Sequence, residues 1–195
     1  MNCPVCASNK TEIKFWKNGY RIVSCHTCSH LFTDFKPTEE EIHQYYSDDY
    51  FFKGGAGYED YTLEKDILIK RGAYYSDKIK EYIHSGKLLD IGAAAGFILK
   101  GFEERGWTGM GIEPNGSMAE YGRNIVGVDI KKGTIESVEL EEKFDLILMI
   151  QSVAHISNIG NVIKKIHQLL KPGGFVLIET WDKDSLTARI LGKHW

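Results

Sequence analysis

The stretch Lys87–Phe97, KLLDIGAAAGF, decides the fold of this chain. It begins as a short apolar run with residues suited to both faces of a buried parallel strand. A loop of small residues follows, and Phe97 begins a helix. Gly92 and Gly96 let the backbone turn tightly and approach a ligand, and the helix start offers unpaired N–H groups to an anion. The stretch therefore predicts a strand–turn–helix unit that binds a nucleotide cofactor.

Two acidic residues indicate which nucleotide cofactor it is. The dinucleotide fingerprint G-x-G-x-x-G is absent, because Ala94 and Phe97 stand where its second and third glycines belong. Asp90, just before the turn, would serve a pyrophosphate poorly. A second strand, predicted over Thr108–Ile112, leads into Glu113, which lies 23 residues after Asp90 and can hold both ribose hydroxyls. This pattern favours S-adenosylmethionine (SAM), whose methionine part carries an ammonium group and a carboxylate. The alternative is an ordinary strand–turn–helix unit whose glycines serve only packing.

Length and composition describe a soluble globular protein. The chain has 195 residues, of which 43% are hydrophobic and 26% charged, enough for one domain of about 150 residues and a small appendage. No apolar run reaches the roughly 18 residues of a membrane helix, and no secretory signal is visible, so we expect a cytoplasmic protein without a membrane partner. Residues 1–36 carry five basic and two acidic side chains, whereas residues 37–66 carry two basic and nine acidic ones. This distribution is not typical of a nucleic-acid groove.

The cysteines predict a metal site at the start of the chain. They form two C-x-x-C pairs separated by 18 residues: Cys3, Cys6, Cys25 and Cys28. The chain between them is predicted to form a hairpin around Asn18-Gly19. A segment of about 35 residues needs a metal to fold, and four thiolates leave no open coordination position. We therefore expect a structural Zn²⁺ in a ribbon over residues 1–36. Two disulfides are disfavoured in a cytoplasmic chain, and a redox C-x-x-C would need a βαβ context.

Residues 37–86 are predicted to be a helical connector. Thr38 and Glu41 form the pattern of a capping box at a helix start. The segment 47–58, rich in aromatic residues and glycines, can either form a lid over the cofactor cleft or pack the ribbon onto the main domain. A long helix is predicted over Leu63–His84. Its expected buried side consists of Ile67, Tyr74, Tyr75, Ile79, Tyr82 and Ile83.

Strands and helices alternate through residues 87–195. The predicted elements are Leu88–Ile91, Phe97–Arg105, Thr108–Ile112, Ser117–Asn124, Val128–Lys131, Phe144–Ile150, Val162–Leu170 and Phe175–Trp181. Such alternation predicts an α/β fold, a mostly parallel sheet with helices on both faces.

Four motifs over residues 87–181 resemble those of the class I SAM-dependent methyltransferases. They are Asp90-x-Gly92-x-x-x-Gly96, Glu113-Pro114, Phe144-Asp145-Leu146-Ile147 and Leu170-Lys171-Pro172-Gly173-Gly174. With the cysteine ribbon in front, the chain is similar to a bacterial branch of that family with an N-terminal zinc-binding domain. The resemblance implies a Rossmann-like doubly wound sheet with the strand order 3-2-1-4-5. It also implies methyl transfer to a small acceptor, such as a sugar nucleotide, a polysaccharide or a natural-product precursor.

The resemblance also implies roles for individual residues. The implied cofactor-binding residues are Asp90, Gly92, Ala93, Ala94, Gly96, Glu113, Pro114, Thr134, Ile135, Glu136 and Gln151. In this reading the loop Asp90–Gly96 surrounds the methionine part and Glu113 holds the ribose. Residues 134–136 lie against the adenine, and Gln151 borders the methyl group.

Two positions depart from the usual pattern of the family, and a third has two possible roles. Ala94 replaces the middle glycine of the loop, which is tolerable if its φ is negative. Ala154 replaces an acid that usually precedes the histidine at 155. His155 is the candidate catalytic base for a hydroxyl or carbon acceptor, since histidine titrates near neutral pH. Its alternative role is that of a structural histidine beside the fourth strand.

The C-terminal part is shorter than the family pattern. Class I methyltransferases add two strands after the one matching Phe175–Trp181, whereas this chain offers a predicted helix, Asp184–Leu191. We expect a C-terminally incomplete domain with an apolar edge strand. Either the chain is then a fragment of a longer one, or its edge strand is covered. The cover is a partner, such as a second copy, or the segment Asp182–Trp195. Two other functions stay open: a ribosomal-RNA methyltransferase whose ribbon reads RNA, and a truncated cofactor-binding protein without catalytic activity.

Overall fold

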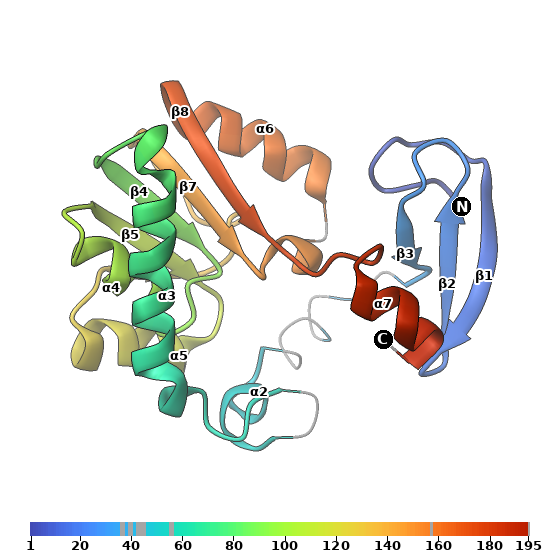
Figure 1. Cartoon of the computed structure of the whole chain (residues 1–195), viewed down its shortest axis with the longest axis horizontal. Coiled ribbons are helices and arrows are strands. Elements are labelled where there is room, and N and C mark those ends of the chain that lie inside the picture. Colours follow the sequence, from blue (N-terminus) through green and yellow to red (C-terminus); the bar gives the residue numbers. More distant parts are fainter. Residues whose placement is uncertain (36–37, 39–40, 42–45, 55–56, 157, 195) are drawn as a thin grey trace.

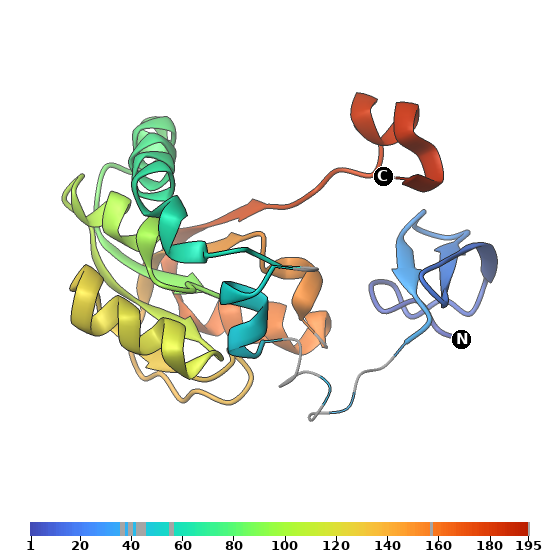
Figure 2. The same cartoon turned by 90° about the horizontal axis from the view of Figure 1, so that it is seen from below.

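The computed structural model describes residues 1–35, 38, 41, 46–54, 57–156 and 158–194. The described chain contains a three-stranded sheet near the N-terminus and a five-stranded sheet flanked by helices. Figures 1 and 2 show the small sheet standing apart from the larger α/β body, with the C-terminal helix α7 (Leu186–Leu191) reaching towards it.

The N-terminal sheet is an antiparallel ribbon in the order β1-β2-β3. Its strands are β1 (Thr11–Lys17), β2 (Tyr20–Cys25) and β3 (Leu31–Thr33). Asn18 and Gly19 join β1 to β2 with φ angles of 50° and 81°, as a two-residue hairpin turn with the twist of its strands requires. The predicted hairpin is confirmed, and β3 was not predicted. Trp16 is 65% exposed, so the ribbon buries little apolar surface of its own.

The larger sheet has the predicted order and direction. Its five strands pair in parallel in the order β6-β5-β4-β7-β8, which confirms the doubly wound topology. The strands are β4 (Lys87–Ile91), β5 (Thr108–Glu113), β6 (Ile130–Lys132), β7 (Phe144–Ile150) and β8 (Leu170–Glu179).

The helices cover both faces of this sheet (Figure 1). The α-helices before α7 are α2 (Asp48–Phe52), α3 (Lys65–Lys78), α4 (Phe97–Glu103), α5 (Gly116–Tyr121) and α6 (Ile159–Leu169). Helix α5 continues as a π-helix over Gly122–Val126. Short 3-10 helices span Tyr61–Glu64, Ile79–Glu81, Val153–His155 and Gly192–His194.

Alternating strand residues build two apolar cores. On β4, Leu88 joins the cluster beneath α4 and α5, while Leu89 joins the cluster beneath α6. Both side chains have no exposed surface. A strand that is apolar on both faces therefore lies at the centre of the sheet, as its sequence predicts.

The predicted buried side of α3 is partly wrong. Ile67, Tyr74 and Tyr82 are 67%, 56% and 66% exposed, whereas Gly72, Ala73 and Ser76 are buried. The reason is close backbone packing: a Cβ at Gly72 would lie 2.2 Å from the carbonyl oxygen of Ile98 on α4. Small residues decide which side of α3 faces the core, and the spacing of its large apolar residues does not. The other three predicted residues, Tyr75, Ile79 and Ile83, do pack against the core.

Aromatic residues of the connector pack against the larger domain. Phe51 and Tyr61 are buried, and Tyr61 stacks on Phe97 of α4 with ring centroids 5.4 Å apart. Phe51 meets Tyr61 edge to face at 5.6 Å. These rings pack on the α/β body, and among the described residues no ring contact joins this segment to the ribbon. The capping box is present, with the Thr38 N–H donating to the Glu41 carboxylate at 2.8 Å, and Ile42 and Tyr45 lie outside the described residues.

Strand β8 begins earlier than predicted and forms an open edge. It starts at Leu170 because Pro172 and Gly173 sit in a bulge of the edge strand, where Gly173 has a φ of 80°. Val176 and Ile178 remain 36% and 46% exposed, so residues 182–194 do not cover this edge. Strand β6 is also displaced from the predicted range, since it runs over Ile130–Lys132.

Candidate functional site

Two buried carboxylates lie at the carboxyl ends of neighbouring parallel strands. Asp90 on β4 is 2% exposed and Glu113 at the end of β5 is 3% exposed. Burial raises the pKa of Asp90 to about 7, and the nearby carboxylate of Glu113 adds to the rise. Such a pair holds strong hydrogen-bond acceptors in a site from which water is largely excluded.

Backbone amides fix the orientation of Glu113. Its Oε2 accepts from the N–H of Ala94 and its Oε1 from the N–H of Asn115, each at 2.8 Å. Burial raises the pKa of Glu113 to about 7, although both of these bonds favour the charged form. Each oxygen keeps a lone pair for a ligand, so the carboxylate is preorganised for a bidentate contact.

The loop between β4 and α4 is shaped by left-handed backbone conformations. Gly92 and Gly96 have φ angles of 79° and 74°, and a Cβ at Gly92 would lie 2.8 Å from the Cβ of Ser152. The condition under which an alanine is tolerable at position 94 is not met: the φ of Ala94 is 48°, which costs about 1–2 kcal/mol for an L-residue. The bond from the Ala94 N–H to Glu113 explains why this conformation is held, because a negative φ would alter the loop that aims this N–H.

The residues at this loop fit SAM. Among the described residues, neither Asp90 nor Glu113 has an ion-pair partner, although both are buried. The Oγ of Ser152, beside Gly92, is also buried without a hydrogen-bond partner in the described structure. A ligand with an ammonium group and a ribose diol supplies the donors that these groups lack.

The segment expected against the adenine follows β6. Thr134 forms a turn closed by hydrogen bonds with Ser137. Ile135 is 2% exposed and belongs to the apolar core beneath α6, whereas Glu136 is exposed. Tyr46 of the connector lies near both acids, because the charges of Glu113 and Glu136 add to the burial that raises its pKa. Pro114, half-buried, lies between Glu113 and the start of α5.

A cavity of about 610 Å³ opens beside the end of β7. Its lining residues come from the connector, the end of β7 and the chain after β8: Tyr50, Tyr58, Arg71, Gln151, Ala154, His155, Glu179, Thr180, Trp181, Asp182, Ser185 and Thr187. Gln151 has a φ of 57°, and its Nε2 donates to Glu179 Oε1 at 2.9 Å. The predicted residues Gln151 and His155 are therefore brought together in one cavity.

His155 lies in the 3-10 helix after β7, next to the connector. Its ring centroid is 5.8 Å from that of Tyr46. Partial burial lowers the pKa of His155 below its ordinary value of 6.5. The imidazole is therefore mostly neutral at pH 7 and can accept a proton.

Several residues of this cavity were not found from the sequence. Arg71 of α3 brings a guanidinium group to the cavity, and no carboxylate in the described parts of the chain pairs with it. Tyr50, Tyr58 and Trp181 supply ring faces, and Trp181 is 77% exposed. Arg71 and Trp181 lie far in the sequence from Tyr50 and Tyr58, and no motif connects them. The aromatic density of residues 50–61 was the one available signal.

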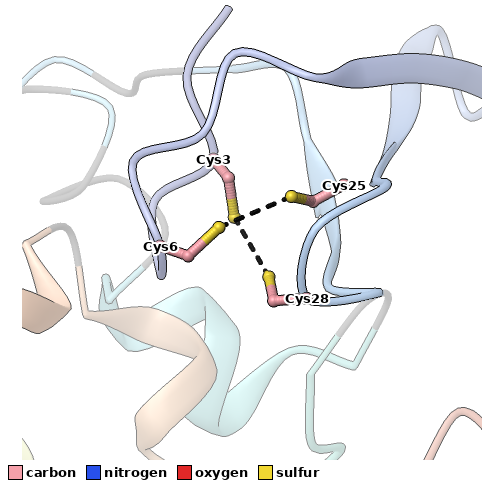
Figure 3. Close-up of side chains that lie close together, drawn as sticks. All are labelled: Cys3, Cys6, Cys25 and Cys28. Atoms are coloured by element: carbon pink, nitrogen blue, oxygen red, sulfur yellow. Dashed lines mark hydrogen bonds between the residues drawn. The ribbon is translucent and has the colours of Figure 1, made fainter.

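The four cysteines converge at the end of the ribbon (Figure 3). Their sulfur atoms all lie within 4.8 Å of one another, and none forms a disulfide. Close contacts cross between the two C-x-x-C pairs, at 3.6 Å for Cys3 and Cys28 and 3.5 Å for Cys6 and Cys25. Tetrahedral ligands with bonds of about 2.3 Å lie about 3.8 Å apart, so this cluster fits a four-thiolate metal site.

The fold and the acid pair define a class of protein, a Rossmann-like domain for a nucleoside cofactor without a pyrophosphate. The sequence profile of the family described as "Methyltransferase domain" matches residues 67–195. The chain therefore belongs to this family of methyltransferase domains.

Individual relatives cover parts of the chain. A ubiquinone biosynthesis O-methyltransferase of Bradyrhizobium sp. (strain ORS 278) is 29% identical over 118 residues, which are 56% of this chain and 46% of the relative. A SAM-dependent methyltransferase from Thermotoga maritima, described as a possible histamine N-methyltransferase, is 28% identical with a TM-score of 0.52, over 68% of this chain and 63% of that one.

A further solved structure shares the fold. The SAM-bound amino pentose methyltransferase CalS10 from Micromonospora echinaspora is 23% identical with a TM-score of 0.53, over 59% of this chain and 51% of that one. At this identity the likeness shows the fold alone. The chain spans about half the length of the curated relatives it matches.

Within the described residues, no helix is both long and apolar enough to cross a bilayer.

Proposed function

We propose that this protein transfers a methyl group from SAM to a small polyhydroxylated acceptor, such as a sugar or a sugar nucleotide. The cavity beside Gln151 and His155 carries this proposal. Aromatic faces from Tyr50, Tyr58 and Trp181 suit the C–H surface of a sugar ring. Glu179 and Asp182 offer carboxylate oxygens to its hydroxyl groups. A cavity of about 610 Å³ lies within the range of small-molecule sites.

The cofactor, when bound, supplies an activated methyl group on a sulfonium centre. The chain's own residues hold and orient the two ligands. Asp90 and Glu113 bind the ammonium and ribose groups, and Arg71 is placed to bind a carboxylate or phosphate. Neutral His155 takes the proton from the acceptor hydroxyl as it becomes a nucleophile. Holding both ligands in reacting geometry contributes most of the rate.

We also propose that Cys3, Cys6, Cys25 and Cys28 hold one structural Zn²⁺. The thiol cluster and its sulfur spacing support this assignment. Four thiolates complete a tetrahedral shell, so no position remains for an acceptor or a reacting water. The ion therefore stabilises the ribbon and takes no part in methyl transfer.

The proposal is tested with labelled SAM and a panel of acceptors. The panel contains nucleotide sugars, free sugars, histamine and ribosomal RNA, and product is measured with wild-type protein and with His155→Ala. Label in a sugar, lost in the variant, supports the proposal. Label in histamine alone indicates an amine acceptor, and label in RNA alone indicates that the ribbon reads RNA. Calorimetric binding of SAM without label transfer to any acceptor identifies a cofactor-binding protein without activity.

A further inference from the structure

Asn115 connects the two halves of the site. It follows the Glu113-Pro114 pair, is 5% exposed, and uses every hydrogen-bonding group of its side chain. Its Oδ1 accepts from the N–H of Met118 at 2.7 Å and caps α5. Its Nδ2 donates to the carbonyl oxygen of Tyr46 at 2.7 Å and to Oδ1 of Asp48 at 3.0 Å. One amide therefore joins the helix after the ribose acid to the start of α2.

The far side of this contact reaches the acceptor cavity. Tyr46 lies against the ring of His155. Beyond Asp48, helix α2 carries Tyr50, which meets Tyr58 edge to face at 5.8 Å, and both tyrosines line the cavity. The backbone N–H of Asn115 meanwhile holds Oε1 of Glu113. A single residue thus touches the donor acid and fixes the segment that forms one wall of the acceptor cavity.

We infer that Asn115 is a positioning residue that couples the ribose end of the donor site to closure of residues 46–54 over the acceptor cavity. A cap needs only an oxygen acceptor, which Ser and Asp supply equally well. The two donated bonds to the connector need the amide nitrogen, which neither of these residues has. Capping alone therefore does not explain why this residue is an amide. The two bonds that Nδ2 donates to Tyr46 and Asp48, which we call the latch, do explain it. This inference rests on the proposed function for its role in methyl transfer, but the latch itself is measurable without any acceptor.

Three variants separate the latch from the cap. Asn115→Ser keeps an acceptor for Met118 and loses both donated bonds. Asn115→Asp also keeps the cap, but its charge faces Asp48 and the carbonyl of Tyr46. Adding Asp48→Asn to Asn115→Asp reverses the direction of one bond, because the amide at position 48 can then donate to the carboxylate at position 115. The control is Asn158→Ser, since Asn158 caps α6 by the same kind of bond, to the N–H of Asn161, away from the connector.

Hydrogen exchange of residues 46–54, with and without S-adenosylhomocysteine, tests the latch. We expect exchange to accelerate about tenfold in Asn115→Ser, more in Asn115→Asp, and to return towards wild type in the double variant. In wild type the probe slows this exchange further. In Asn115→Ser the probe binds within about threefold of wild type by calorimetry but no longer slows exchange of the segment.

The outcomes distinguish the latch from the proposed function. Unchanged exchange in Asn115→Ser, or equal acceleration in Asn158→Ser, overturns the latch. So does failure of the double variant to recover relative to Asn115→Asp. If wild type does not bind S-adenosylhomocysteine while Asn115→Ser still releases the segment, Asn115 holds the segment as inferred, but its coupling to a donor and the proposed function are both wrong.

Discussion

Burial raises the pKa of the carboxyl group of Asp90, and the carboxylate of Glu113 beside it raises this pKa further. The two residues end adjacent parallel strands, where β4 and β5 run in register up to Ile91 and Ile112. Each is buried, so neither charge is well solvated, and both carboxyl groups titrate near neutral pH in the free protein. A positively charged ligand would relieve the repulsion between the two carboxylates, so the pair favours binding of such a ligand.

The first prediction concerns stability and pH. The pKa of Asp90 rises from 3.8 to about 7, and that of Glu113 from 4.5 to about 7. The folded state holds these protons more tightly than the unfolded chain. The stability they contribute is therefore present below pH 4 to 5 and is lost as the pH rises to about 7. Asp90→Asn removes one of the titrating groups.

The measurement is the Tm of wild type and Asp90→Asn from pH 5 to 8 without ligand. We expect the Tm of Asp90→Asn to rise relative to the Tm of wild type as the pH increases, by several degrees in total. A gap between the two proteins that stays constant across this range contradicts the assignment.

The second prediction concerns the ribose contact. Glu113→Ala is expected to weaken binding of SAM by about 1.5–3 kcal/mol, the range for hydrogen bonds to a charged group. Calorimetry measures the loss, and Glu120→Ala, on the exposed side of α5, is the matched control. An unchanged affinity in Glu113→Ala would show that other residues hold the ribose.

The third prediction concerns cofactor choice. NAD should not compete with SAM, because the loop before α4 lacks the dinucleotide glycines and Asp90 opposes a pyrophosphate. A competition titration followed by calorimetry decides the matter. Tight binding of NAD would refute the choice of SAM.

The fourth prediction concerns His155. His155→Ala should lower kcat about 10²–10⁴-fold for a hydroxyl acceptor, while the Kd for SAM stays unchanged. Since burial lowers the pKa of His155, the acidic limb of the wild-type rate profile should lie below pH 6.5. His167→Ala, on the exposed side of α6, is the control. A rate that survives in His155→Ala assigns the base to another group.

The fifth prediction concerns the metal. Elemental analysis should find one zinc per chain, and Cys6→Ser should lose it. The ribbon then becomes sensitive to protease, while the affinity for SAM changes little because its proposed ligands lie on the larger sheet. Metal-free wild-type protein with an intact ribbon would contradict the assignment.

The sequence predicts those parts of the fold that depend on local pattern. Asp90 and Glu113 were found because each stands at the carboxyl end of a clear apolar run. The hairpin at Asn18-Gly19 was found because its turn needs positive φ angles. The parallel sheet followed from the alternation of strands and helices, and the order of its strands from the resemblance to the class I methyltransferases.

What the sequence did not predict depends on contacts between distant segments. The side of α3 that faces the core is set by Gly72 against Ile98, which no periodicity of large apolar residues reveals. The positive φ of Ala94 is maintained by a bond to Glu113, 19 residues away. Asn115 was not singled out from the sequence, because its bonds to Tyr46 and Asp48 depend on the path of the connector.

The close contact between α3 and α4 also bears on where an independent folding unit begins. A Cβ at Gly101 would lie 2.1 Å from the carbonyl oxygen of Ile69, so the two helix backbones touch in both directions. Helix α3 therefore moves with α4, whose first residue adjoins the cofactor loop. A fragment that begins at Lys87 would lack α3 and would expose the backbone of α4 to water. The shortest fragment that keeps its cofactor loop rigid begins upstream, at the 3-10 helix Tyr61–Glu64 whose tyrosine stacks on Phe97.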